Sequence, residues 1–284
     1  MNKNFKIAII GSGTMGNGIT HVSAQSGFKT LMIDIDKIQL DKALLTIENN
    51  LNRQTKKNII SCEDKDRIMK NISVSTNIDS CINVDLVIEA VPEKYDLKCT
   101  IFKKIDKICK ESTIIASNTS SISISELGNQ TKRPQNVIGM HFMNPVPIMK
   151  LVEVIKTVHT SQKTLDSVLS LAKKMNKVPI ECNDYPGFVS NRILMPMINE
   201  AIFCLEQNVA SKESIDGIMK LGMAHPMGPL QLADYIGLDI CLDIMEVLHN
   251  GFKDSKYRPC PLLKKMVSSG LLGKKTGMGF YKYD

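Results

Sequence analysis

A histidine and a glutamate form the first candidate catalytic pair. His141 lies in the apolar run 137–142 and Glu153 in the run 148–155, with the turn 144–147 between them. Alternation along the second run puts Glu153 on a face with apolar residues, where a carboxylate without a partner is costly to bury. If the turn lets the two strands lie side by side, His141 is the natural partner. Such a pair suits general acid–base catalysis, and a histidine satisfied in the core is the alternative.

A glycine-rich turn supplies the second candidate site. The segment 11–16, Gly-Ser-Gly-Thr-Met-Gly, follows an apolar run typical of a buried parallel strand and precedes a helical pattern. In that context the glycines allow a tight turn, close approach of a pyrophosphate and close packing of the helix, whose N-terminus faces the phosphates. The alternative is a loop without a ligand. The predicted cofactor contacts of the turn are Gly11, Gly13, Thr14, Met15 and Gly16.

The next predicted strand, 30–34, ends in a carboxylate. Asp34 can accept hydrogen bonds from both ribose hydroxyls of an adenosine and would repel a 2′-phosphate. We therefore expect NAD to be the cofactor and not NADP, and Asp36 adds negative charge nearby. The alternative role of Asp34 is to cap a helix that begins near Lys37.

Further predicted elements must position these residues. Helical patterns over 37–57 and 61–70 exceed what a crossover needs and indicate a helical hairpin, with Lys56 and Lys57 at its tip. Beyond it, βα alternation resumes, with predicted strands at 72–75, 85–91 and 113–117, a helix at 97–110, a helix at 161–176 and a strand at 178–181.

Polar residues follow two of these strands at their carboxyl ends. Glu93 and Lys98 follow one strand, and the segment 118–121, which includes Asn118 and Ser120, follows the next. Ligands of such sheets bind at this edge, so these side chains are candidates for cofactor or substrate contacts. The alternatives are ordinary helix-start interactions and N-capping.

The alternation of strands and helices stops at 184–187, where we place a domain boundary. The predicted fold is an α/β Rossmann-type doubly wound sheet with a helical-hairpin excursion over 1–184, followed by an all-α domain over 185–284. Asn191 lies beside the boundary, from where it could reach back across the cleft. The predicted helices of the second domain are 188–207, kinked at Pro196, 211–221, capped by Ser211, 229–249 and 262–269.

Bulk properties narrow the class of protein. The 284 residues are 43% hydrophobic, and no apolar run approaches the roughly 20 residues that span a bilayer. The first strand begins too near Met1 to leave room for a signal peptide. Eight cysteines without metal-ligand spacing indicate reduced thiols in the cytoplasm and no metal. The net charge of +7 is not concentrated in a nucleic-acid groove and suits a polyanionic small molecule.

Seven ordered motifs together resemble the L-3-hydroxyacyl-CoA dehydrogenase family, in particular its short-chain bacterial 3-hydroxybutyryl-CoA branch. They are the segments 11–16, 117–121, 141–145, 150–154, 186–192, 225–229 and 277–281. The resemblance implies interconversion of (S)-3-hydroxybutyryl-CoA and acetoacetyl-CoA with NAD(H), in fatty acid or butanoate metabolism. It also implies a homodimer formed through the helical domain.

The resemblance assigns roles to individual residues. It makes His141 the general acid and base, Glu153 its orienting partner, and Ser120 and Asn191 hydrogen-bond donors to the substrate oxygens. It places Lys57 near coenzyme A. The positions that it places in the NAD site are Asp34, Glu93, Lys98, Asn118, Asn144 and Lys275.

Two other functions remain open from the sequence. One is a sugar-acid (gulonate) 3-dehydrogenase of the lambda-crystallin type, which shares the nucleotide half and the His–Glu pair. The other is a non-catalytic NAD-binding protein, although such a protein has no need of all of Ser120, His141, Glu153 and Asn191. Three departures from the family, Asn50, Gln231 and Ser190, concern coenzyme A contacts and acyl-chain preference and not the proposed chemistry.

Overall fold

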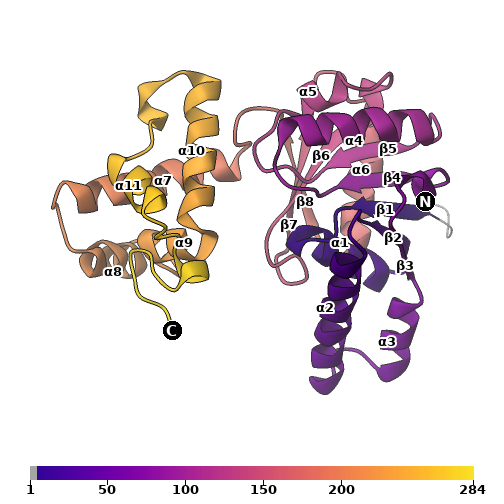
Figure 1. Ribbon diagram of the computed structural model, residues 1–284, viewed down its shortest axis with the longest axis horizontal. Coiled ribbons are helices and arrows are strands. Elements are labelled where there is room, and N and C mark those ends of the chain that lie inside the picture. The colour runs from indigo at the N-terminus through magenta and orange to yellow at the C-terminus, as the bar shows by residue number, and fades with distance from the viewer. Residues whose placement is uncertain (1–4) are drawn as a thin grey trace. The chain divides into compact units, whose positions relative to one another are not determined.

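The computed structural model describes residues 5–284, which form two compact units that divide between Asp184 and Tyr185 (Figure 1). The first unit is built on one eight-stranded sheet with the order β3-β2-β1-β4-β5-β6-β7-β8. Its strands are β1 (Lys6–Ile10), β2 (Lys29–Ile33), β3 (Ile72–Ser75), β4 (Leu86–Glu89), β5 (Ile114–Ser117), β6 (Val137–Phe142), β7 (Leu151–Lys156) and β8 (Val178–Asn183). The predicted Rossmann-type sheet is thereby confirmed.

Every neighbouring pair in the sheet is parallel except β6 and β7, which are antiparallel. The strand order reverses beside β1, with β2 on one side and β4 on the other. A ligand of such a sheet binds in the crevice outside the carboxyl ends of the strands at this reversal. A cofactor site is therefore expected at the carboxyl ends of β1, β2, β4 and β5.

Within residues 5–184, six α-helices accompany the sheet: α1 (Thr14–Gln25), α2 (Lys37–Lys56), α3 (Cys62–Met69), α4 (Tyr95–Ile108), α5 (Ile124–Gly128) and α6 (Gln162–Lys174). Apolar residues of α1 and α6 share one core with the central strands, among them Ile19, Val168 and Ile88, which are fully buried. Burying side chains of this size contributes roughly 1.5–3 kcal/mol each, so this core fixes both helices against the sheet.

The predicted helical hairpin is present. Helices α2 and α3 contact each other and extend away from the sheet in Figure 1. Asp36 caps α2 by accepting from the amide of Ile38, and Ser61 caps α3 in a reciprocal capping box with Asp64. Lys57 follows the end of α2 and is exposed.

One strand begins later than predicted. We expected a strand from 148, but β7 begins at Leu151. The carbonyl of Pro145 accepts hydrogen bonds from the amides of Ile148 and Met149, both at 3.0 Å, so these residues belong to a turn. The ammonium of Lys177 donates to the carbonyl of Met149 at 2.8 Å and holds the turn in place.

The second unit is all helical. Its helices are α7 (Ser190–Glu206), α8 (Lys212–Gly222), α9 (Pro229–Ile236), α10 (Leu238–Phe252) and α11 (Pro261–Ser268). Helix α7 begins two residues later than predicted because Phe188 has a φ of 51°. It continues through Pro196, and Ser211 caps α8 as predicted.

The predicted single helix 229–249 is wrong, because two helices, α9 and α10, meet at Gly237. This glycine has a φ of 105°, and the amide of Leu238 bonds to the carbonyl of Leu272 instead of continuing the ladder of α9. Within residues 5–284, no helix is both long and apolar enough to cross a membrane.

Candidate active site

The turn between β1 and α1 has the geometry of a phosphate cradle. Gly11 has a φ of 102°, and a Cβ there would lie 2.5 Å from the carbonyl oxygen of Ala90. A Cβ on Gly16 would lie 1.9 Å from the carbonyl oxygen of Gly11, whereas a Cβ on Gly13 would meet no protein atom within 4 Å. Gly13 is thus the position where a side chain would obstruct a ligand and not the fold. No side chain caps α1, which leaves its first amides available to an anion.

Asp34 lies just beyond β2 and is held in place. The backbone amide and the hydroxyl of Ser12 donate to Oδ2 of Asp34, both at 2.8 Å, and the amide of Asp36 donates to Oδ1 at 3.1 Å. The alternative that Asp34 caps α2 is wrong, since Asp36 does so. Each carboxylate oxygen has further lone pairs, so Asp34 can still accept from ribose hydroxyls.

These two features border the same pocket, which has a volume of about 780 Å³. Apolar side chains from several elements line it, including Ile33, Ile78 and Ile101. Gly11, Gly13, Thr14, Met15 and Asp34 also lie on its wall. An apolar slot with a carboxylate and an open helix N-terminus fits an adenosine joined to a pyrophosphate.

The antiparallel pairing of β6 and β7 brings the candidate catalytic pair together. His141 lies directly opposite Glu153 in the strand register, and Nδ1 of His141 lies 2.8 Å from Oε2 of Glu153. The two residues are 6% and 4% exposed. Because an ionised carboxylate can only accept, Nδ1 carries the proton of the neutral ring and Nε2 is left as the acceptor.

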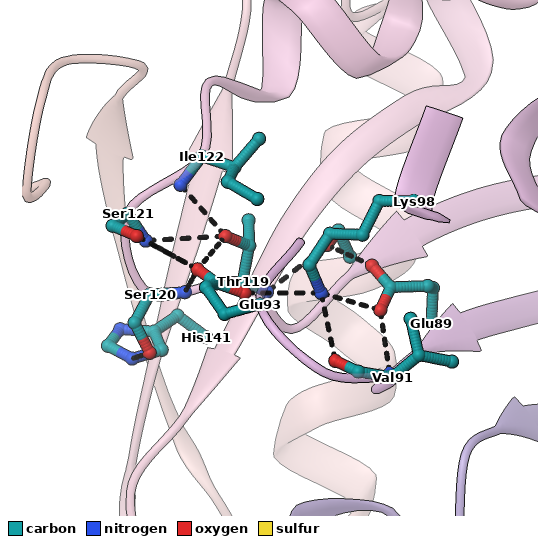
Figure 2. Close-up of polar contacts among 10 residues, drawn as sticks. Glu89, Val91, Glu93, Lys98, Thr119, Ser120, Ser121, Ile122 and His141 are labelled. Atoms are coloured by element: carbon teal, nitrogen blue, oxygen red, sulfur yellow. Dashed lines mark hydrogen bonds and ion pairs between the residues drawn. The ribbon is translucent and has the colours of Figure 1, made fainter. Parts of the chain in front are cut away.

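Ser120 meets the other side of this imidazole, with its Oγ 3.1 Å from Nε2 of His141 (Figure 2). It lies in the loop 118–121 that follows β5. The N-capping alternative for this loop is wrong, because Ser123 caps α5. Asn118, in the same loop, accepts from the amide of Phe142 through Oδ1 at 2.9 Å and ties the loop to β6.

Glu93, in the segment between β4 and α4, fastens the same loop (Figure 2). Its Oε1 accepts from the amides of Ser120 and Ser121 at 2.9 and 3.1 Å and from the hydroxyl of Thr119. Its Oε2 lies 3.2 Å from Nζ of Lys98. Partial burial alone would raise the pKa of Glu93, but the Lys98 ammonium and the hydroxyls of Thr119 and Ser121 outweigh it and lower the pKa.

Sequence reasoning missed Glu89, the last residue of β4. Glu89 is fully buried and lies 2.6 Å from Nζ of Lys98, whose side chain is 1% exposed. The sequence pattern that indicates a partner for Glu153 also applies to Glu89, because both are carboxylates inside an apolar strand. Ser12, which holds Asp34, was missed as well.

Four further predicted site residues are divided between the two units. Asn144 is exposed in the turn after β6, and Lys57 lies on the hairpin. In the second unit, Asn191 is buried in the first turn of α7, and Lys275 pairs with Asp239 at 2.5 Å. The contacts implied for these four residues with NAD or substrate stay predictions.

A Rossmann-type sheet with a dinucleotide cradle, and with a buried histidine–carboxylate pair on the same sheet, defines the class of nicotinamide-dependent oxidoreductases. Comparison with known proteins gives the particular family. Residues 6–185 match the family model for the 3-hydroxyacyl-CoA dehydrogenase NAD binding domain, and residues 187–283 match the model for the 3-hydroxyacyl-CoA dehydrogenase C-terminal domain. The chain belongs to the 3-hydroxyacyl-CoA dehydrogenase family, and it is an NAD-dependent enzyme.

Individual relatives align over nearly their whole length. A probable 3-hydroxybutyryl-CoA dehydrogenase of Bacillus subtilis is 52% identical over 279 residues, which cover 98% of this chain and 97% of the relative. The human mitochondrial hydroxyacyl-coenzyme A dehydrogenase is 43% identical, with 98% and 90% covered. The crystal structure of (S)-3-hydroxybutyryl-CoA dehydrogenase from Ralstonia eutropha is 49% identical, with a TM-score of 0.96 and 98% and 99% covered.

Proposed function

We propose that the protein interconverts (S)-3-hydroxybutyryl-CoA and acetoacetyl-CoA with NAD(H). The observation that carries the proposal is the alignment of Ser120, His141 and Glu153 at 3.1 and 2.8 Å on the sheet that bears the dinucleotide cradle. The substrate is supported by the names of relatives that are 49–52% identical over nearly full length.

His141 acts as the general base in the oxidative direction. Nε2 takes the proton of the 3-hydroxyl group, and the ring becomes an imidazolium whose positive charge faces Glu153 across 2.8 Å. In the reductive direction Nε2 returns that proton to the forming alkoxide. Glu153 holds the ring orientation and offsets the new charge, as the orienting carboxylate does in other catalytic triads. The hydroxyl of Ser120 positions the substrate oxygen beside Nε2.

NAD supplies the hydride acceptor when it is bound. The amides of the 11–16 turn bind its pyrophosphate, and Asp34 binds the adenosine ribose. Asp34 is already oriented by Ser12, so it presents a fixed negative charge to any 2′-phosphate. We therefore expect NADH to be strongly preferred over NADPH.

The second unit completes the proposal. Asn191 serves as a second donor to the substrate oxygen, and Lys275 contacts NAD, as the family resemblance implies. Lys57 on the hairpin of the first unit binds the coenzyme A phosphates.

We assign substrate binding and homodimer formation to 185–284, where exposed apolar side chains such as Ile218 and Leu221 support an interface. The eight free cysteines support a cytoplasmic location.

The test is the loss of NADH absorbance when the purified protein is mixed with acetoacetyl-CoA. We expect rapid NADH oxidation, at least about tenfold slower oxidation of NADPH at equal concentration, and no NAD reduction with gulonate. Gulonate turnover without acetoacetyl-CoA turnover would replace the proposal with a sugar-acid dehydrogenase. A folded protein that binds NADH and turns over neither substrate would contradict both activities.

A further inference from the structure

Glu89 and Lys98 form an ion pair that is withdrawn from solvent in the first unit. Their side chains are 0% and 1% exposed, and Nζ of Lys98 lies 2.6 Å from Oε1 of Glu89. The ammonium also donates to the carbonyl of Val91 at 3.2 Å and lies 3.2 Å from Oε2 of Glu93. Three acceptors thus meet the three protons of the lysine, so its charge is fully satisfied in spite of its burial.

Two chains of contacts lead from Glu89 to the loop that carries Ser120. In the first, Oε2 of Glu89 accepts from the hydroxyl of Ser117 at 2.6 Å, and the same hydroxyl oxygen accepts from the amide of Thr119 at 3.1 Å. In the second, Lys98 links Glu89 to Glu93, which accepts from the amide of Ser120. Figure 2 shows how Glu89, Lys98 and Glu93 lead from β4 to the loop.

A contribution to stability does not explain why β4 ends in a buried carboxylate that is paired with Lys98. Well-packed apolar residues often replace such pairs with no loss of stability, and the three residues before Glu89 in β4 are apolar and fully buried. The carboxylate of Glu89 accepts from the amide of Val91 at 2.7 Å and from the side chains of Lys98 and Ser117, and these two side chains lead on to the segment 119–121. The pair therefore gives that segment a fixed position, which packing alone would leave adjustable.

We propose that Glu89 is a positioning residue for the reaction, acting on the Ser120 hydroxyl through Lys98–Glu93 and through Ser117. This inference rests on the proposed function, since it assumes that Ser120 positions the substrate oxygen at Nε2 of His141. Glu89 touches neither residue. It fixes the loop backbone so that Oγ of Ser120 stays at 3.1 Å from the imidazole, and a misplacement of about 1 Å in such a constellation can cost about 100-fold in rate.

The experiment is a double-mutant cycle between Glu89 and Ser120, with kcat and KM measured for acetoacetyl-CoA at saturating NADH. We expect Glu89→Gln to lower kcat by about 30- to 100-fold with less than about a threefold change in KM. In a Ser120→Ala background the same substitution should lower kcat by less than about threefold, because Glu89 has then lost the group through which it acts.

A matched control breaks a different buried ion pair of the same unit. Arg133 donates through Nε to Asp106 at 2.7 Å, and their side chains are 8% and 9% exposed. Neither residue contacts the loop 118–121 in any hydrogen bond or ion pair found among residues 5–284. Asp106→Asn should lower the melting temperature as much as Glu89→Gln does and leave kcat within about twofold of wild type.

Equal kcat losses from Glu89→Gln in the wild-type and Ser120→Ala backgrounds would overturn the inference, as would an unchanged kcat in the folded Glu89→Gln protein. If Glu89→Gln does not fold, Ser117→Ala interrupts one of the two chains and should lower kcat by about three- to tenfold, whereas an unchanged kcat would overturn the inference. Failure of the wild type and Asp106→Asn to reduce acetoacetyl-CoA would instead count against the proposed function.

Discussion

Two buried histidines of the first unit, His141 and His21, have opposite surroundings. His141 on β6 has a carboxylate at Nδ1 and a hydroxyl at Nε2. His21 on α1 is fully buried, and its Nε2 lies 3.3 Å from the side-chain nitrogen Nε2 of Gln54. The Nδ1 of His21 has no hydrogen-bond partner within residues 5–284. Both are withdrawn from water, so the difference lies in their partners.

The comparison shows that a carboxylate decides what a buried histidine can do. The pKa of His21 is lowered to about 4, and burial is the main cause; the side chain of Gln25 raises the pKa by a smaller amount, and the positive charge of Lys177 lowers it by the smallest. His21 therefore stays neutral near pH 7 and cannot hold a proton for a reaction. His141 has Glu153 to stabilise its protonated form, which makes it the imidazole suited to proton transfer.

Removing the imidazole of His141 should have the largest effect on activity. We expect His141→Ala to lower kcat for acetoacetyl-CoA reduction by about 10³- to 10⁴-fold, because general acid–base catalysis is lost along with an ordered contact to Ser120. His159→Ala, at an exposed position, is the control and should stay within about twofold of wild type. NADH binding and the melting temperature establish that the variant is folded. Turnover that survives the substitution would remove His141 from the mechanism.

Replacing Glu153 makes the surroundings of His141 resemble those of His21. Glu153→Gln keeps an acceptor oxygen near Nδ1 but removes the negative charge that offsets the imidazolium, so kcat should fall by about 100-fold. The control is Glu181→Gln on the neighbouring strand β8, which removes a carboxylate paired with Lys156 and should change kcat by less than about twofold. Similar kcat values for the two variants would mean that the charge of Glu153 does not support the reaction.

Period-two alternation predicts that Glu153 needs a partner, and His141 is the natural one if the two strands lie side by side. The antiparallel pairing of β6 and β7 meets that condition. The same signal was present at Glu89, but its partner Lys98 lies on α4, and only the packing of α4 against the sheet brings the two charges to 2.6 Å. Contacts between adjacent strands can be predicted from the alternation of side chains along each strand and from the order of the strands in the sheet. Contacts between a helix and a strand end depend on tertiary packing that periodicity does not specify.

Breaks in helices show a similar limit. The apolar pattern continues across Gly237, so it predicted one helix over 229–249. The break depends on the positive φ of Gly237 and on the carbonyl of Leu272, which is distant in sequence and captures the amide of Leu238. The turn that delays β7 likewise depends on the carbonyl of Pro145 and on Lys177, and neither is visible as a period in the sequence.

The free energy of unfolding should depend on pH through His21 and not through the proton transfer proposed for His141. The pKa of His21 is about 4 in the folded protein and 6.5 in an unfolded chain, so the unfolded state binds more protons between these values. The contribution of neutral His21 to the free energy of unfolding is therefore fully present above pH 6.5. It is lost as the pH falls toward 4, and the loss amounts to at most about 3 kcal/mol.

His21→Leu should remove this part of the pH dependence. Urea unfolding of wild type and variant across pH 4–7 measures it: the wild-type free energy of unfolding should fall more steeply toward acid, and the difference between the two proteins should change by up to about 3 kcal/mol. The other titratable groups are common to both proteins, so their contributions cancel in the difference. Parallel curves would mean that the pKa of His21 does not differ between the folded and the unfolded protein, and the contrast with His141 would then lose its basis.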